Sequence, residues 1–189
     1  MMDERLKRLV SKLSSYALSR GASSAKLIRT EDITVGHWVR LKCMYGCDDY
    51  GKYFTCPPYT PTPEQTRKIL DEYRHAMLFE FRDIKDSRRL KSIHNLMLEL
   101  ERIAFLDGFY KAFAFIANTC TMCDRCPAGE LSCASKQDKK LCLHPEKARP
   151  SMQACGIDVF STARKAGYDV DVVTTPDRGF KSFTLLLIE

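Results

Sequence analysis

Three thiols follow one another at two-residue intervals in the stretch Cys120-Thr-Met-Cys123-Asp-Arg-Cys126-Pro127. Side chains at that spacing cannot all share one face of a regular helix or strand, but they can line a loop that curls around one inorganic centre. The C-x2-C-x2-C run is the opening of the pattern with which bacterial ferredoxins hold a cubane iron–sulfur cluster. The stretch therefore predicts a metal centre, and its spacing favours an iron–sulfur cluster of the [4Fe-4S] type.

A cubane cluster or a tetrahedral zinc ion needs a fourth ligand, and Cys133 and Cys142 compete for that position. The residues around Cys133 are polar and typical of a surface excursion, whereas Leu143-His144-Pro145 gives Cys142 a stiffer setting. Because a ligand must be held in place by its surroundings, we expect Cys142 to complete the set. His144 can bind zinc, but a lone histidine beside proline is more often an ordinary loop residue.

Zinc is the alternative metal. Structural zinc sites usually pair two C-x2-C units across a longer stretch, whereas this chain places three thiols in series, which suits one face of a cube better. Two functions from different classes follow. One is an iron–sulfur protein with an electron-transfer or redox role, and the other is a zinc-stabilised binding or regulatory module whose metal sites are purely structural.

A second thiol group lies upstream, in Cys43-x3-Cys47-x8-Cys56. Three cysteines in an irregular segment rich in Gly, Pro and Tyr are more typical of a metal site than of buried core thiols. The fourth ligand of this group stays open among Cys155, His37, a water molecule and a substrate atom. A cubane with one open iron would bind substrate, and a fully ligated one would only transfer electrons. Both thiol groups can also converge on a single centre.

Arg149 and Ser151 stand shortly after Cys142 and are candidate cofactor-binding residues. Ser151 can cap a helical turn whose amides point at an anion or at cluster sulfurs, and Arg149 can neutralise the same charge. An ordinary capped turn with a surface arginine explains the pattern equally well.

Hydrophobic periodicity predicts an α/β (α+β) fold in which a mixed β-sheet is flanked by helices. The helices are expected within residues 6–17, 62–73, 90–104 and 158–166. The strands are expected within residues 25–28, 33–35, 76–81, 112–117, 170–174 and 183–188, the last two forming a C-terminal hairpin. The strand at 112–117 leads directly into Cys120. Residues 37–63 and 118–157 are expected to be two irregular cysteine-rich loops.

Composition and charge restrict the compartment and the partners. The 189 residues are 44% hydrophobic, which suffices for one metal-binding domain over residues 1–189. Five of the first eight residues are charged and no apolar run is long enough to cross a bilayer, so we expect a cytoplasmic protein. As an iron–sulfur protein it would belong to an anaerobic type of metabolism. In that reducing compartment nine cysteines indicate metal ligands or redox thiols. The net charge of +6 is dispersed among acidic residues, which favours a mildly basic solvated surface over a nucleic-acid footprint. The partner expected for an iron–sulfur protein is a redox partner protein.

The longest motifs resemble one known family. Arg40-Leu-Lys-Cys43-x3-Cys47 and the stretch from Cys56 to residue 63 look like the N-terminal signature of the prokaryotic predicted metal-binding proteins, domain of unknown function 2284. The stretch from Cys142 to Val159 is similar to the second signature of that family. The resemblance covers most of the chain from Arg40 onward and implies metal binding, of the iron–sulfur kind, with no assigned reaction. It places the cysteine run of the family on Cys120, Cys123, Cys126 and Cys142.

Overall fold

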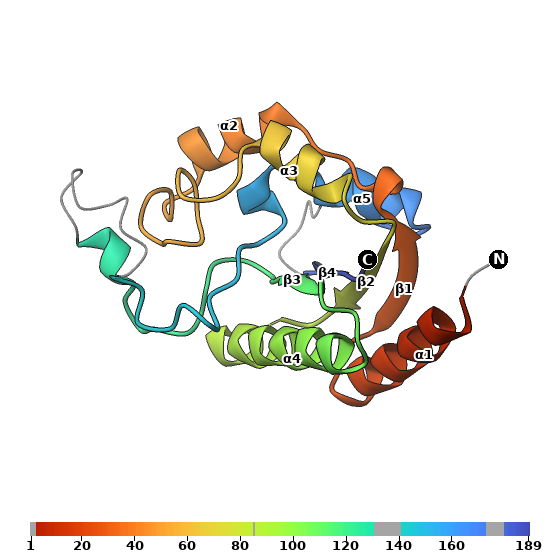
Figure 1. Ribbon diagram of the computed structural model, residues 1–189. Coiled ribbons are helices and arrows are strands. Elements are labelled where there is room, and N and C mark those ends of the chain that lie inside the picture. Colours follow the sequence, from red (N-terminus) through yellow and green to blue (C-terminus); the bar gives the residue numbers. More distant parts are fainter. Residues whose placement is uncertain (1–2, 85, 131–140, 173–179) are drawn as a thin grey trace.

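Figure 1 shows the protein as a computed structural model, in which residues 3–84, 86–130, 141–172 and 180–189 are described. The α-helices of these residues are α1 (Glu4–Ser19), α2 (His37–Gly46), α3 (Pro63–Leu70), α4 (Ser87–Leu106) and α5 (Val159–Lys165). The strands are β1 (Ser24–Arg29), β2 (His75–Phe81), β3 (Phe113–Phe115) and β4 (Ser182–Leu187). Short 3-10 helices are η1 (Thr30–Asp32), η2 (Pro127–Gly129) and η4 (Gln153–Cys155).

The four strands form one sheet between two layers of helices (Figure 1). Helices α1 and α4 cover one face of the sheet, and α3 and α5 cover the other. Alternate residues of β2 point to opposite faces of the sheet. Met77, Phe79 and Phe81 pack with α1 and α4, whereas Ala76 and Leu78 pack with α3 and α5. Both central strands, β2 and β4, are therefore buried almost along their whole length.

The sheet is antiparallel throughout, so the predicted mixed sheet is wrong. The strand order is β1-β2-β4-β3, and each of the three neighbouring pairs runs antiparallel. Strands β2 and β3, which the long helix α4 connects, do point the same way, as the helix–strand alternation suggested. They are not neighbours, because the C-terminal strand β4 is inserted between them in the opposite direction.

The predicted C-terminal hairpin is also wrong. Residues 170–172 are not in a strand, and β4 already has β2 on one side and β3 on the other. Residues 173–179, which include the predicted turn, lie outside the described part of the chain. The predicted strand at 33–35 is reduced to a single bridge between Val35 and Ile157.

The predicted starts and ends of the helices are confirmed where side-chain capping defines them. Thr62 and Gln65 form a reciprocal capping box at the start of α3, and the Asp158 carboxylate accepts the Ser161 N–H at 3.0 Å at the start of α5. Gly21 follows α1 with φ of +90°, a conformation that glycine adopts without strain. The first cysteine segment differs from the prediction, because its residues 37–46 form helix α2 rather than a loop.

Helix α4 carries two buried polar side chains that hold the cysteine-bearing segments. His94 is 1% exposed, and its Nε2 lies 2.9 Å from the Lys147 carbonyl oxygen, which can only accept. Nε2 therefore donates, and Nδ1 accepts from the Thr121 hydroxyl at 3.0 Å and from the Thr121 N–H at 3.4 Å. One imidazole thus joins the segment after Cys120 to the segment after Cys142.

Glu101, two turns further along α4, makes the second set of contacts. Its carboxylate accepts two hydrogen bonds from the Arg149 guanidinium, at 2.9 Å and 2.5 Å, and one from the Ala114 N–H of β3 at 2.7 Å. The pair is largely buried, with 15% and 16% of the two side chains exposed. Removing either partner would leave an uncompensated charge in the interior.

We predict that His94→Ala lowers the free energy of unfolding by about 2–5 kcal/mol, because it leaves a cavity and deprives Thr121 and the Lys147 carbonyl of their buried partner. Chemical denaturation measures this loss. His37→Ala is the matched control, because the His37 side chain is 74% exposed at the start of α2. A His94→Ala variant as stable as the control would contradict the assignment.

The same imidazole predicts a pH dependence. Burial lowers the pKa of His94 below its ordinary value, so the unfolded chain takes up this proton before the folded chain does. Stability should therefore fall as the pH is lowered through about 6.5. Denaturation curves of wild type and His94→Gln between pH 5 and pH 7.5 test it, and the variant should lose part of the slope. Parallel pH profiles would exclude the contribution of His94.

Candidate metal centres

The cysteine run and Cys142 line one small cavity. The residues around it include Cys120, Cys123, Cys126 and Cys142, which are the four ligands expected from the sequence. The segment from Tyr53 to Thr55, together with Met122, Pro127, His144 and Ala148, completes the wall. Four thiols on one predominantly apolar cavity are a donor set that suits a thiolate-bound iron–sulfur cluster. Cys133, the competing ligand, lies outside the described residues.

Two backbone features bring the four cysteines together. Asn118 adopts a left-handed conformation with φ of +59°, which turns the chain between β3 and Cys120. The carbonyl of Cys126 accepts the N–H of Gly129 at 3.1 Å, which closes the turn of η2 after the last cysteine of the run. His94 then holds residues 121 and 147 at a fixed separation, so that the segment with Cys142 faces the run.

The upstream cysteines line a second cavity of about 350 Å³. Cys43, Cys47 and Cys56, the three ligands expected for one site, are on its wall. Cys43 lies on α2 and Cys47 directly follows it, and Cys56 lies in the loop before α3. The cavity also has a ring of polar side chains that comprises Asp49, Asn118, Thr119, Ser151 and Gln153. This cavity therefore offers oxygen ligands as well as thiols.

The two cavities are adjacent but separately lined. Thr55 lines the cavity of the cysteine run, and the next residue, Cys56, lines the upstream cavity. In the segment after β3, Thr119 lines the upstream cavity and Cys120 lines the cavity of the cysteine run. Each of these two pairs of consecutive residues places one residue on each cavity. This arrangement favours two neighbouring centres over one shared centre.

Neither of the side chains considered from the sequence as a fourth ligand lines the upstream cavity, whereas Asp49 does. His37 stands at the opposite end of α2 from Cys47, where its Nε2 lies 3.3 Å from a Glu64 carboxylate oxygen. The buried Cys155 lines a different, apolar cavity. Asp49 lines the same cavity as the three thiols. Sequence reasoning missed it because an aspartate in a polar turn carries no signal of its own.

Arg149 and Ser151 have different surroundings. Ser151 is 8% exposed and lines the upstream cavity, and its hydroxyl accepts the Ala154 N–H at 3.2 Å at the start of η4. The Arg149 guanidinium binds Glu101 and the carbonyls of residues 146 and 148, so its donors are directed toward α4 and its own loop. Of the two, Ser151 is therefore the one beside a cysteine site.

Burial and crowding oppose ionisation of the thiols. Burial raises the pKa of Cys56 to about 12, and the charges of Asp49, Cys47, Cys43 and Cys126 add to the rise. Burial also raises the thiol pKa of Cys43, Cys120 and Cys123, and neighbouring thiols add to each shift. Several thiolates can coexist in so small a space only if a cation compensates them.

The described thiols are not tied up in disulfides. Eight of the nine cysteines lie in the described residues, and none of these eight forms a disulfide. Within the described ranges, no three His, Cys, Asp or Glu side chains are grouped closely enough to hold a metal ion as they stand. In the same part of the chain, no helix is both long and apolar enough to cross a membrane.

Comparison with known families supports a metal-binding role. The model of a family described as predicted metal-binding protein (DUF2284) matches residues 26–188, and this range contains all the cysteines discussed above. No match to the chain was found among curated proteins or among solved structures.

We predict that metal binding to the metal-free protein strengthens as the pH rises from 6.5 to 8. Thiols with raised pKa are protonated in this range, so each thiol that becomes a ligand must release a proton. The association constant for Co²⁺, read from its thiolate charge-transfer absorption, should rise about tenfold per pH unit for each proton released. An affinity that stays constant over this range would contradict thiol ligation.

Proposed function

Because the chain belongs to the family of predicted metal-binding proteins (DUF2284), we propose that it is a cytoplasmic iron–sulfur protein with an electron-transfer or redox role. Cys120, Cys123, Cys126 and Cys142 would hold one [4Fe-4S] cluster. The upstream cysteines would hold a second metal centre. The single observation that carries the proposal is that one cavity collects the three cysteines of the run and the distant Cys142.

The spacing of the cysteine run supports a cluster over a zinc ion. Four ligands of one zinc ion stand about 2.3 Å from the same point, so their sulfurs must nearly touch. The irons of a cube occupy separate corners, so the cysteines that bind them stand around a volume. Three thiols in series, as in Cys120, Cys123 and Cys126, suit separate corners of one cube, and Cys142 lines the same cavity. When bound, the cluster would supply reversible one-electron chemistry.

The second centre would differ from the first in its ligands. Three thiols and the Asp49 carboxylate line the upstream cavity, and Ser151 and Gln153 offer further polar contacts. A carboxylate is a weaker and harder ligand for iron than a thiolate, so it would yield its position to a substrate atom more readily. We therefore assign electron transfer to the all-cysteine site and substrate or partner chemistry to the upstream site.

A redox partner would approach at helix α2. Cys47 is exposed at the end of this helix, and Trp38, Leu41 and Tyr45 are 50%, 55% and 83% exposed along it. Exposed aromatic and aliphatic side chains beside a redox centre are typical of weak, transient protein contacts.

Metal analysis of anaerobically purified protein tests the proposal. We expect a brown protein with broad absorption near 400 nm that bleaches with dithionite, together with iron and acid-labile sulfide. Cys142→Ala should lose the cluster of the cysteine run. Cys133→Ala is the matched control and should keep it, because Cys142 and not Cys133 is assigned to the site. A colourless protein with stoichiometric zinc would establish the alternative, a zinc-stabilised binding or regulatory module.

A further prediction concerns the fourth ligand of the upstream centre. Asp49→Asn should shift the EPR spectrum of that centre or abolish it, because the amide is a poorer ligand than the carboxylate. Asp48→Asn is the matched control, since Asp48 is exposed and does not line the cavity. Cys155→Ala should leave the spectrum unchanged. Loss of the signal in Cys155→Ala, with Asp49→Asn unaffected, would reverse the assignment.

A further inference from the structure

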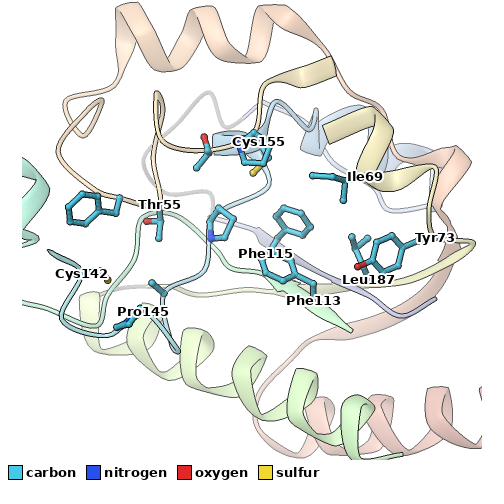
Figure 2. Close-up of a pocket in the computed structure, with 14 residues that line it drawn as sticks. Thr55, Ile69, Tyr73, Phe113, Phe115, Cys142, Pro145, Cys155 and Leu187 are labelled. Carbon is cyan, nitrogen blue, oxygen red and sulfur yellow. The ribbon is translucent and has the colours of Figure 1, made fainter. Parts of the chain in front are cut away.

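An apolar cavity of about 440 Å³ lies beside the cysteine run, between α3 and the β3 end of the sheet (Figure 2). Its size falls within the range of small-molecule sites. Four aromatic side chains and several aliphatic ones face it, from elements far apart in the sequence. The apolar lining includes Phe54, Ile69, Tyr73, Phe113, Phe115 and Leu187.

The lining carries no charged side chain among the described residues, and most of its polar groups are occupied. The Tyr73 hydroxyl donates to the Lys111 carbonyl at 2.8 Å. The Thr60 hydroxyl donates to the Ala154 carbonyl at 2.5 Å and accepts from Arg40 at 2.9 Å. A charged ligand would lose its hydration here without compensation, so the cavity selects a neutral molecule.

Thr55 is the exception among these polar groups. Its side-chain oxygen is buried and has no hydrogen-bond partner in the described part of the chain, and the residue is 8% exposed. Leaving a buried hydroxyl without a partner is costly, and native proteins rarely do so without a reason. The oxygen is shielded from the cavity in this position, so the Thr55 side chain would turn about its Cα–Cβ bond to pair with a ligand that carries one hydrogen-bonding group.

The position of Thr55 relates this cavity to the metal site. Phe54, Thr55, Cys142 and Ala148 line both the apolar cavity and the cavity of the cysteine run, so they form a shared wall. Figure 2 shows Thr55 and Cys142 at one end of the apolar cavity and Tyr73 and Leu187 at the other. A molecule that hydrogen-bonds to Thr55 therefore lies against Cys142, one of the proposed cluster ligands.

We propose that the apolar cavity is a binding site for a neutral, predominantly apolar ring compound with one hydroxyl or carbonyl group. The aromatic side chains stack against the ring, and the Thr55 hydroxyl pairs with the polar group at the end next to Cys142. The binding step does not depend on which metal the cysteines hold, so failure of the iron–sulfur assignment leaves this proposal and its test intact.

Three probes test the chemistry of the site: 2-naphthol, naphthalene and 2-naphthoate. Titration of the full-length protein, followed by probe fluorescence, should show saturable binding of 2-naphthol and at least tenfold weaker binding of the charged 2-naphthoate. Thr55→Val keeps the shape of the side chain and removes its hydroxyl. It should weaken 2-naphthol binding about 3- to 10-fold, the value of one net hydrogen bond, and leave naphthalene binding unchanged.

A blocking variant tests the location. Ile69 lines the cavity from α3 and is 37% exposed, so Ile69→Trp can extend into the cavity without disturbing the core. This variant should reduce 2-naphthol binding at least tenfold. Leu18→Trp makes a comparable change on α1, where Leu18 is 48% exposed on the other helix layer. Thermal unfolding should show that all variants fold.

Two results would overturn the proposal. One is the absence of saturable 2-naphthol binding to the folded wild-type protein. The other is binding that neither Thr55→Val nor Ile69→Trp weakens relative to Leu18→Trp, because the probe would then occupy a different surface.

Discussion

The buried imidazole of His94 is the interaction on which the arrangement of the proposed metal ligands depends. It joins residues 121 and 147 through two ring nitrogens with opposite roles, and it must stay neutral to do so. The first of these residues follows Cys120 by one position, and the second follows Cys142 by five. A rigid helix therefore sets the separation of two chain segments that would otherwise be independent loops. Bound metal would join the same segments a second time, so folding and metal binding should be coupled.

Helix α4 can hold both segments because it crosses the sheet between β2 and β3, two strands that are not neighbours. Strand β4 fills the gap between β2 and β3, and the two helix layers bury both faces of the central strands. The chain that leaves β3 then turns at Asn118 and supplies Thr119 to one cavity and Cys120 to the other. All three cavities are therefore lined by residues of β3 or by residues that directly follow it.

The features that could be predicted from the sequence are those set by a few neighbouring residues, such as helix caps and cysteine spacing. The capping residues Thr62 and Asp158 and the cysteine spacing each require only a few consecutive residues to recognise. Pairing of β4 with β2 and β3 is decided by contacts about 70 to 110 residues away, so turn chemistry near residue 177 wrongly favoured a hairpin. Asp49 and Thr55 were missed for a related reason, because only the folded loop shows what an isolated polar side chain faces.

Two adjacent cavities are proposed each to hold iron. Anomalous diffraction at the iron absorption edge, from crystals grown without oxygen, tests this claim most directly. We expect one peak enclosed by Cys120, Cys123, Cys126 and Cys142 and a separate peak enclosed by Cys43, Cys47 and Cys56. Peaks at the zinc edge instead, or an anomalous peak in neither cavity, would contradict the account.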